Sequence, residues 1–408
     1  MKKIVVTGMG AVTPVGIGVE NYWNNITAGA SGIDTIKTFD PSELAVQIAG
    51  EVKDFNPSDY LPKDLIRKTD PFMQYAYIAA EEAMKQSGIK IEPERTGIVM
   101  GTAMAGIATI AYTQEALTGA SHKKVGPRFI PKILGNIAAA NIAIDYNIQG
   151  PSFTVSTACS SGGDAINTAC MCMQSGKADI KVAVGAESVL CPLVIYSLAN
   201  AKALSRRNDS PSTASRPFDV TRDGFVIGEG GGALVLETEE HALARGAKIY
   251  AEIRGCGNTD DAYHVTAPHP EGRGAIACMK QAIAEAGINP SDIGYINAHG
   301  TATNKGDTVE TSSIKKVFGN TLPYVSSTKG ATGHMMGAGG ITETITCIKA
   351  IETGTVPPTI ILNEVDPECA GIDFVANTAK KAEINFAMSN AFGFGGQNSS
   401  IIVGKYGK

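Results

Sequence analysis

The sequence predicts an α/β protein of two similar halves, in which helices cover sheets that contain parallel strands. The first observation is an internal repeat, because segments of the first half recur in the same order in the second. The second is that each half alternates short β-branched runs with longer helical patterns. The boundary falls between residues 1–246 and 247–408, where a helical segment ends at Arg245-Gly246 without a Pro- or Ser-rich linker. The halves are therefore expected to pack as one body.

Three pairs of segments carry the repeat. A helix end, a turn and a strand that runs into Gly-Thr-Ala occur at residues 87–103 and again at 286–302. The run Val-Ser-Thr-Ala-Cys at 155–159 is echoed by Val-Ser-Ser-Thr-Lys at 325–329, and the glycine-rich residues 224–236 are echoed at 391–403. Because all three pairs keep one order, they indicate two similar halves.

The chain opens with a predicted strand at residues 4–7, a glycine-rich turn and a helix from about Val19 to Thr27. The turn does not fit a dinucleotide-binding fingerprint, because Gly8-Met-Gly10 is followed by Ala-Val-Thr where a third glycine is required. Nucleotide binding is therefore not expected here.

A second helix is expected after Asp70 as N-cap and Pro71 in the first turn, and it ends at Gly88. Its apolar residues fall on one face, which predicts a helix packed on the core. The uncharged residues 96–114 are interpreted as buried strand and loop, since three glycines interrupt them. No membrane span is expected.

Composition limits the classes of function. The chain has 408 residues and 43% hydrophobic content, enough for a large core. A net charge of −5 without a long basic run argues against nucleic-acid binding. The eight cysteines form no Cys-x-x-Cys pair or Cys/His ligand cluster, which favours reduced thiols in the cytoplasm and no metal site. The predicted first strand follows Met1-Lys-Lys directly, so no signal peptide is expected.

The chemistry centres on Cys159. A β-branched run at residues 153–157 breaks at this cysteine, and an apolar helix is predicted to follow the glycine pair Gly162-Gly163. A sharp strand-to-helix turn would leave the sulfur at a helix N-terminus, where backbone N–H groups and the helix dipole favour a thiolate. A core cysteine that packs as a small hydrophobe is the alternative, but the turn favours a nucleophile.

Histidines supply the second part of the constellation. His299 and His334 each follow an expected strand end and are surrounded by small residues, so both imidazoles can reach one pocket. There they would stabilise a developing oxyanion through neutral N–H groups. His264 lies in a loop, residues 261–266, whose polar side chains are candidates for lining a channel. The other three histidines are interpreted as surface residues: His122, His241 and His269.

Five motifs resemble those of β-ketoacyl-[acyl-carrier-protein] synthases, most closely the elongating synthase II type. The resemblance extends from Val5 to Val403, and its motifs keep the family order. It implies a thiolase-like fold, with two duplicated halves in a five-layered αβαβα body assembled as a homodimer. The motifs are Thr157-Ala-Cys159-Ser-Ser-Gly, Asn297-Ala-His299-Gly-Thr-Ala-Thr, Ser327-Thr-Lys329, Thr332-Gly-His334-Met-Met-Gly-Ala-Gly-Gly and Asn390-Ala-Phe-Gly-Phe394-Gly-Gly-Gln-Asn.

The resemblance also implies roles for individual residues. Cys159 would accept the acyl group, and His299 and His334 would bind the malonyl thioester carbonyl during decarboxylation. Lys329 would stand behind the histidines with Glu343 as its acidic partner. Phe394 would belong to a gating loop, and its backbone N–H with that of Cys159 would form the acyl oxyanion hole. No cofactor is implied. The remaining positions implied to bind substrate are Thr301, Thr303 and Thr266 for pantetheine and Met104 at the acyl channel.

The implied partner is an acyl carrier protein, a small acidic protein. Because this chain is itself acidic, docking requires a local basic surface. Asp64 stands at one position where the family has a basic residue, which puts that contact in doubt. The candidates for docking are Arg67, Lys68, Lys202, Arg206 and Arg207.

The implied reaction is the decarboxylative condensation of an acyl group on Cys159 with malonyl-[acyl-carrier-protein], in fatty-acid elongation. A ketosynthase of a polyketide or polyene pathway remains open. A catalytically silent chain-length-factor partner is disfavoured by the intact Cys159, His299 and His334. A thiolase is disfavoured because residues 392–398 lack a second cysteine, and a cysteine hydrolase because two histidines with Lys329 suit carbanion chemistry.

Overall fold

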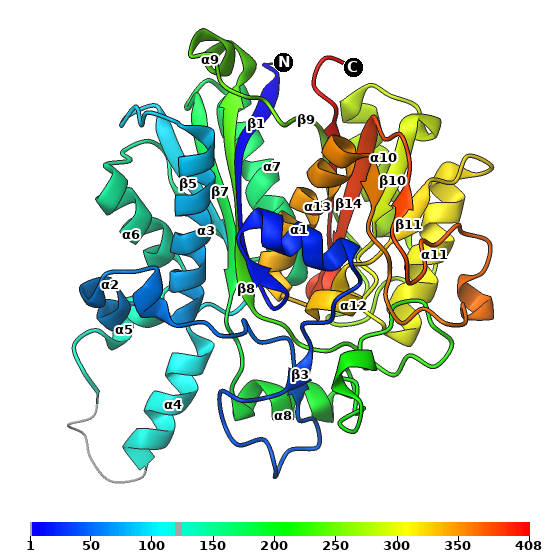
Figure 1. Ribbon diagram of the computed structural model, residues 1–408, viewed down its shortest axis with the longest axis horizontal. Coiled ribbons are helices and arrows are strands. Elements are labelled where there is room, and N and C mark those ends of the chain that lie inside the picture. Colours follow the sequence, from blue (N-terminus) through cyan, green and yellow to red (C-terminus); the bar gives the residue numbers. More distant parts are fainter. Residues whose placement is uncertain (1, 119–124) are drawn as a thin grey trace.

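A mixed sheet organises the protein, whose computed structural model describes residues 2–118 and 125–408 (Figure 1). Within these residues, eleven strands pair in the order β11-β10-β14-β15-β9-β1-β8-β7-β5-β6, with β2 paired to β1. The strands are β1 (Ile4–Thr13), β2 (Gly16–Ile17), β5 (Thr96–Gly101), β6 (Phe153–Val155), β7 (Ile180–Glu187), β8 (Gly230–Thr238), β9 (Ala251–Asp260), β10 (Ile293–Asn297), β11 (Tyr324–Ser326), β14 (Phe386–Phe392) and β15 (Gln397–Gly404). His122 lies outside the described residues.

The pattern of antiparallel and parallel pairing is the same on both sides of the central pair β1 and β9. β1 and β9 meet antiparallel, with Ile4 opposite Ile253. Outward from them, β8 and β15 are antiparallel to their neighbours, whereas β5 pairs parallel with β6 and β7, and β10 pairs parallel with β11 and β14. Two short two-stranded sheets lie apart: β3 (Asp34–Thr35) with β4 (Ile48–Ala49), and β12 (Thr355–Val356) with β13 (Lys380–Lys381).

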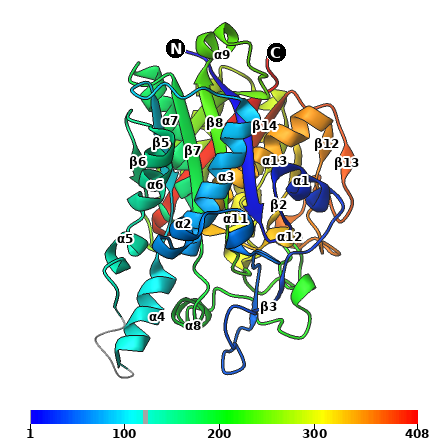
Figure 2. The ribbon, with the colours of Figure 1, turned by 60° about the vertical axis from the view of Figure 1, so that its left-hand side comes forward.

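Helices lie outside and between the two groups of strands of this sheet, so that the body consists of layers (Figures 1 and 2). α3 and α6 cover the outer face of β1, β8, β7 and β5, and α10, with α11 beside it, covers β9 and β15. α7 and α13 pack against each other between the two groups of strands. The predicted five-layered αβαβα architecture is therefore confirmed. These helices are α3 (Pro71–Ser87), α6 (Asn136–Tyr146), α7 (Ser161–Gln174), α10 (Arg273–Ala286), α11 (Asn304–Phe318) and α13 (Gly339–Thr353).

The remaining helices are shorter or lie at the edges. Two of them, α4 and α5, extend from the side of the body in Figure 2. No helix among the described residues is long and apolar enough to cross a bilayer. The set consists of α1 (Val19–Thr27), α2 (Lys63–Lys68), α4 (Ile107–Thr118), α5 (Phe129–Ile133), α8 (Pro192–Asn200), α9 (Glu239–Ala244) and α12 (Lys329–Thr332).

Local sequence signals placed two helices correctly. α1 spans the expected residues, and α3 begins after Asp70, whose carboxylate accepts a hydrogen bond from the backbone N–H of Phe72. Gly88 ends α3 in the left-handed conformation, with φ of 60°. The interpretation of residues 96–114 as strand and loop is wrong in its second part, because α4 begins at Ile107. Its half-exposed face carries no charge in this stretch, so periodicity alone did not reveal the helix.

The predicted glycine-rich turn after residue 7 is also wrong, since β1 continues to Thr13. Gly8 and Gly10 instead allow α3 to pack directly on the strand. A Cβ at either position would lie about 2 Å from a helix carbonyl oxygen, that of Ala83 or of Ala79. Gly255 and Gly257 of β9 meet α10 in the same way. The glycines therefore serve helix-to-sheet contact, and they do not form a turn.

Candidate active site

Cys159 lies in a tight turn between β6 and α7. Residues 158–160 form a short 3₁₀ turn that leads directly into the helix at Ser161. Ala158 has φ of 51°, a left-handed conformation that is strained for a residue with a side chain. The thiol is 8% exposed. The predicted strand, turn and helix are present, and the sulfur lies close to the helix N-terminus.

His334 directly contacts this thiol. Its Nε2 lies 3.0 Å from Cys159 Sγ. The loop that carries the imidazole is fixed on both sides, because the backbone N–H of His334 donates to the Val226 carbonyl at 2.7 Å and its own carbonyl accepts from Gly228 at 2.9 Å. The Phe225 ring packs edge-on against the imidazole, with centroids 5.4 Å apart. The imidazole is thus held against the sulfur by several independent contacts.

His299 completes the pair from the end of β10. Its ring lies nearly perpendicular to that of His334, with centroids 5.2 Å apart. The buried carboxylate of Glu310, on α11, accepts hydrogen bonds from the backbone N–H groups of His299 and Gly300, each at 2.8 Å. Burial raises the pKa of Glu310 to about 7. No sequence motif identified Glu310, because it lies within α11, 11 residues after the histidine whose backbone N–H it binds.

Both imidazoles are neutral at ordinary pH. Burial, and then the nearby Lys329 charge, holds the pKa of His299 and of His334 well below the usual value for histidine. A neutral imidazole donates one N–H and accepts at its other nitrogen. The pair can therefore donate hydrogen bonds to an oxyanion without acting as strong acids.

Lys329 and Glu343 form a buried ion pair behind the histidines. Their side chains are 2% and 4% exposed, and the Lys329 ammonium donates to Glu343 Oε1. Burial raises the pKa of the Glu343 carboxyl, and the lysine opposes that shift. The ion pair places a fixed positive charge beside two neutral imidazoles, where it attracts developing negative charge.

The expectation of a stabilised thiolate at Cys159 is wrong. Burial raises the pKa of this thiol to about 11, although the Phe394 backbone N–H and the Lys329 charge both act to lower it. The thiol is therefore protonated at neutral pH. His334 Nε2, at hydrogen-bond distance, is the group positioned to take the proton when the sulfur reacts.

Phe394 lies in a glycine-rich loop directly over the turn. Its backbone N–H hydrogen-bonds to the Cys159 sulfur, and its side chain is 40% exposed. Gly395 and Gly396 have φ of 88° and 83°, and Gly395 donates to the Val265 carbonyl at 2.8 Å. This loop therefore rests on residues 261–267, the segment that contains the predicted Thr266, whose own side chain is exposed.

Met104 lies at the edge of an apolar cluster that includes Cys159. It is half-buried and packs against this cluster, whose members also include Leu190, Phe225 and Met336. The cluster extends from the thiol to α8, so an acyl chain on the sulfur would enter apolar surroundings. The predicted position of Met104 beside an acyl channel is compatible with this packing.

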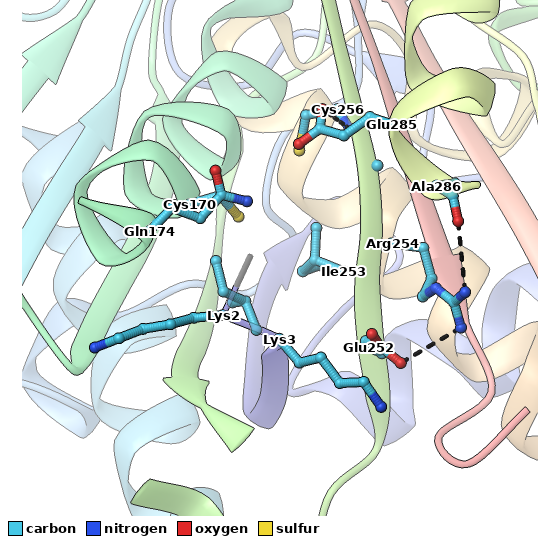
Figure 3. Close-up of a pocket in the computed structure, with 12 residues that line it drawn as sticks. Lys2, Lys3, Cys170, Gln174, Glu252, Ile253, Arg254, Cys256, Glu285 and Ala286 are labelled. Atoms are coloured by element: carbon cyan, nitrogen blue, oxygen red, sulfur yellow. Dashed lines mark hydrogen bonds and ion pairs between the residues drawn. The ribbon is translucent and has the colours of Figure 1, made fainter. Parts of the chain in front are cut away.

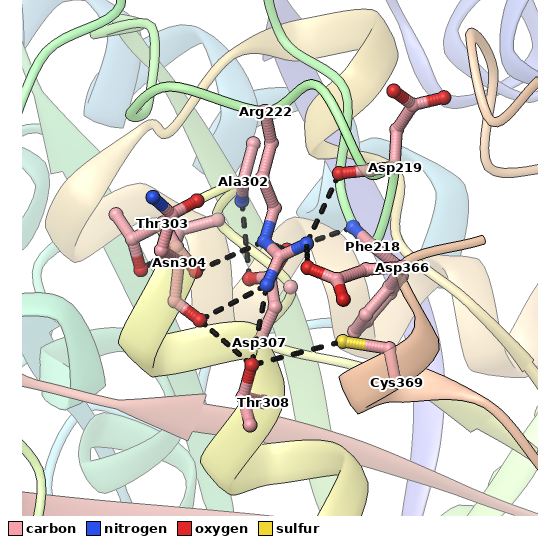
Figure 4. A network of polar contacts seen from close by, with 12 residues as sticks. Phe218, Asp219, Arg222, Ala302, Thr303, Asn304, Asp307, Thr308, Asp366 and Cys369 are labelled. Atoms are coloured by element: carbon pink, nitrogen blue, oxygen red, sulfur yellow. Dashed lines mark hydrogen bonds and ion pairs between the residues drawn. The ribbon is translucent and has the colours of Figure 1, made fainter. Parts of the chain in front are cut away.

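The predicted Thr301 and Thr303 lie just before α11. The hydroxyls of Thr301 and Thr303 are 3.1 Å apart, and Ala302 between them has φ of 67°. Arg222 holds this strained turn, donating to the carbonyl oxygens of Thr303 and Asn304 (Figure 4). The same guanidinium contacts the Asp366 carboxylate at 2.5 Å. The network therefore fixes the backbone beneath the two threonine hydroxyls.

The predicted docking residues lie on exposed segments around α2 and after α8. Arg67 lines a groove of about 480 Å³, and the other charged residues that line it, Arg128 and Lys132, are also basic. Sequence reasoning missed these two because they belong to no clustered basic run. Lys68 is half-buried beside Asp64, at 3.7 Å, while Lys202 and Arg206 are exposed. Arg207 is already engaged, donating to the Thr221 carbonyl at 2.6 Å.

A second cavity lies away from this site. It is a hollow of about 150 Å³. Cys170 and Gln174 of α7, Cys256 of β9, and Lys2 and Lys3 before β1 line it (Figure 3). Cys170 and Gln174 are near the C-terminal end of α7, whereas Cys159 precedes its N-terminal end. The hollow is therefore separate from the histidine pair.

Comparisons with known proteins identify the class. Residues 1–242 match the family described as Beta-ketoacyl synthase, N-terminal domain, and residues 250–363 match Beta-ketoacyl synthase, C-terminal domain. The chain belongs to the β-ketoacyl synthase family.

Individual relatives cover the whole chain. It is 43% identical to 3-oxoacyl-[acyl-carrier-protein] synthase 2 of Coxiella burnetii, over 99% of both chains. A solved β-ketoacyl synthase of Burkholderia phymatum superposes with a TM-score of 0.92 at 34% identity, covering 99% of this chain and all of the other. A type II polyketide ketosynthase solved with its acyl-carrier protein superposes with a TM-score of 0.91 at 32% identity, covering 99% of each chain.

Proposed function

We propose that this protein condenses an acyl group held on Cys159 with malonyl-[acyl-carrier-protein], giving 3-oxoacyl-[acyl-carrier-protein], carbon dioxide and free carrier in fatty-acid chain elongation. The observation that carries the proposal is the buried thiol 3.0 Å from a neutral imidazole, with a second neutral imidazole beside it. The name of the Coxiella burnetii relative, at 43% identity, supports the same reaction.

The first step is acyl transfer to the sulfur. Cys159 Sγ attacks the carbonyl carbon of the acyl-carrier thioester, and its proton passes to His334 Nε2. The backbone N–H groups of Cys159 and Phe394 stabilise the oxyanion, a role supported by the hydrogen bond from Phe394 to the sulfur. The carrier thiolate leaves and takes up the proton, which returns His334 to its neutral form.

The second step forms the new carbon–carbon bond. Once the sulfur is acylated and no longer donates to Nε2, His334 carries its hydrogen on Nε2. His299 and His334 then donate N–H hydrogen bonds to the malonyl thioester oxygen, so the electrons of the breaking bond to carbon dioxide move into an enolate. Lys329, with Glu343, adds a fixed positive field. The enolate carbon attacks the Cys159 thioester, and the cysteine sulfur leaves as a thiolate that takes one proton from solvent, the proton that the overall reaction consumes. Because their lowered pKa values keep both imidazoles neutral, no imidazolium is present to protonate the enolate carbon.

The second substrate is held by its pantetheine arm and its carrier. The hydroxyls of Thr301 and Thr303 are proposed to contact the arm, with Thr266 on the loop under Phe394. The groove lined by the basic residues Arg67, Arg128 and Lys132 is proposed to attract the acidic carrier, together with Lys68, Lys202 and Arg206 outside it. Arg207 is proposed to contribute little to carrier docking, because its guanidinium already contacts Thr221 and Asp223.

A cytoplasmic homodimer is proposed as the working form. Residues 1–246 and 247–408 are proposed as the two halves of each chain. Several large apolar side chains are exposed on the edge strand β6 and on α6, α7 and α8, where a second copy would cover them. Sedimentation of the purified protein tests the dimer. The residues concerned are Phe153 on β6, Ile144 on α6, Met171 on α7, and Leu193 and Tyr196 on α8.

Intact-protein mass spectrometry tests the reaction directly. Incubation with acyl-carrier substrates should add one acyl mass, located at Cys159 by peptide mapping. The Cys159→Ala protein should fail to condense yet retain some decarboxylation of malonyl carrier, because decarboxylation depends on the histidines and not on the sulfur. Replacing His299 or His334 should remove both activities. Condensation by Cys159→Ala at the wild-type rate would refute the assignment.

A polyketide pathway is the second candidate, favoured by the similarity to a polyketide ketosynthase at 32% identity. Competition between a saturated acyl carrier and a 3-oxoacyl carrier separates the two pathways. Preferred loading of the saturated chain onto Cys159 supports fatty-acid elongation, and preferred further extension of the 3-oxoacyl chain supports the polyketide pathway.

A further inference from the structure

Glu187 is a buried carboxylate at the end of β7 that no predicted role includes. It is 0% exposed and accepts four hydrogen bonds. Ala103 N–H donates to one oxygen at 2.6 Å and Gly337 N–H to the same oxygen at 3.2 Å. Met104 N–H and the Thr102 hydroxyl donate to the other oxygen, each at 3.1 Å. Burial raises the pKa of Glu187 to about 7, and these oriented N–H and O–H groups oppose that rise by stabilising the carboxylate.

The donors come from two segments far apart in the sequence. Residues 102–104 lead from β5 toward α4 and carry Met104, whereas Gly337 lies three residues after His334. The two segments are in close contact, since a Cβ on Gly337 would lie 2.8 Å from the Glu187 carboxylate and 2.9 Å from Ala103 N. Glu187 thus joins the backbone of the methionine segment to that of the histidine loop.

Both joined segments are locally strained. Ala105 has φ of 48° and Met336 has φ of 47°, conformations that are unfavourable for residues with a Cβ. Such conformations persist only where surrounding contacts hold them. Each strained residue lies next to a donor of Glu187, which indicates that the carboxylate keeps both turns in place.

Both segments also face the apolar cluster around the thiol. Met336 is a buried member of that cluster, which includes Cys159, and Met104 packs against it. We propose that Glu187 is a positioning residue that holds the Met104 segment against the His334 loop and thereby sets the acyl-length discrimination of the channel. This proposal rests on the proposed function, because it assumes that an acyl chain on Cys159 passes Met104.

Only a carboxylate suits this arrangement. An amide of the same shape offers one accepting oxygen and one NH₂ group, which would face two N–H donors or an N–H and a hydroxyl. Glu187→Gln should therefore release either the Met104 side or the Gly337 side while keeping the volume of the side chain. Thr102→Val removes one donor to the same carboxylate and leaves the other three in place, and it also removes the hydroxyl that accepts from Ala105 N–H at 3.2 Å.

The experiment measures kcat/KM for a series of saturated acyl-carrier substrates from short to long. We define the length ratio as kcat/KM for the preferred chain length divided by kcat/KM for the least preferred one. Glu187→Gln should reduce this length ratio by about tenfold, and Thr102→Val should reduce it by a smaller factor. Glu82→Gln is the matched control, because Glu82 also accepts two backbone N–H groups, from Ala11 and Val19, far from the channel. It should lower stability and leave the length ratio unchanged.

The outcomes separate this proposal from the proposed function. If the wild-type protein forms no 3-oxoacyl product, the proposed function fails and the length ratio has no meaning. If the wild-type protein is active and both Glu187→Gln and Thr102→Val keep its length ratio, the positioning role is refuted. An equal loss for every chain length in Glu187→Gln, with a wild-type ratio in Thr102→Val, also refutes it. A reduced ratio in folded Thr102→Val supports it even where Glu187→Gln fails to fold.

Discussion

Removing one member of the buried Lys329–Glu343 pair should destabilise the protein and stop decarboxylation. Glu343→Leu leaves the Lys329 ammonium buried without a counter-charge, because that lysine is only 2% exposed. Such a loss costs about 3–5 kcal/mol. With an unfolding entropy of about 2.1 cal/mol/K per residue, the melting temperature of this 408-residue chain should fall by about 4 to 6 °C.

A double variant separates stability from chemistry. Lys329→Met with Glu343→Leu replaces both charges by apolar groups of similar size, which is neutral or stabilising in buried pairs. Its melting temperature should return to that of the wild type within about 2 °C. Decarboxylation of malonyl carrier should remain at least about a hundredfold reduced, because the positive field beside His299 and His334 is gone.

Scanning calorimetry and carbon dioxide release measure the two effects. Lys349→Met is the control: this lysine is also buried, but its partners Glu20 and Glu352 are 68% and 31% exposed, and it lies outside the site. Its activity should be unchanged and its stability loss smaller, since solvent reaches the remaining carboxylates. The reasoning fails if the double variant is less stable than Glu343→Leu, or if it releases carbon dioxide at the wild-type rate.

Three further predictions follow from single groups. Met104→Phe should shorten the longest acyl chain loaded, because a rigid ring replaces a flexible side chain; an unchanged length profile would place the channel elsewhere. Alkylation of Cys159 should keep rising with pH to about 11, since its raised pKa keeps the thiol neutral below that value; a plateau near neutral pH, with Cys172 as internal reference, would contradict this. Lys68→Glu with Arg206→Glu should raise the KM for carrier substrates and flatten its salt dependence. Turnover of a small pantetheine thioester should stay unchanged, and equal losses on both substrates would exclude a docking role.

Local signals in the sequence determined much of the framework. Caps at Asp70 and Gly88 placed α3, because capping depends on neighbouring residues alone. The segment around Cys159 similarly predicted a strand, a turn and a helix. The motifs around His299 and His334 identified the residues that the structure brings together at the thiol. These features depend on short stretches of chain, so they can be recognised before the fold is known.

Only the tertiary structure decided the properties that depend on distant segments. Gly8 and Gly10 belong to a strand, because α3 packs on them more closely than any side chain allows. The turn at Cys159 suggested a thiolate, yet burial among residues from both halves raises the pKa of its thiol instead. Glu187 shows the same dependence, since its four donors come from segments more than 80 residues away in the chain. Burial and long-range hydrogen bonds arise when separate segments meet, so no local pattern encodes them.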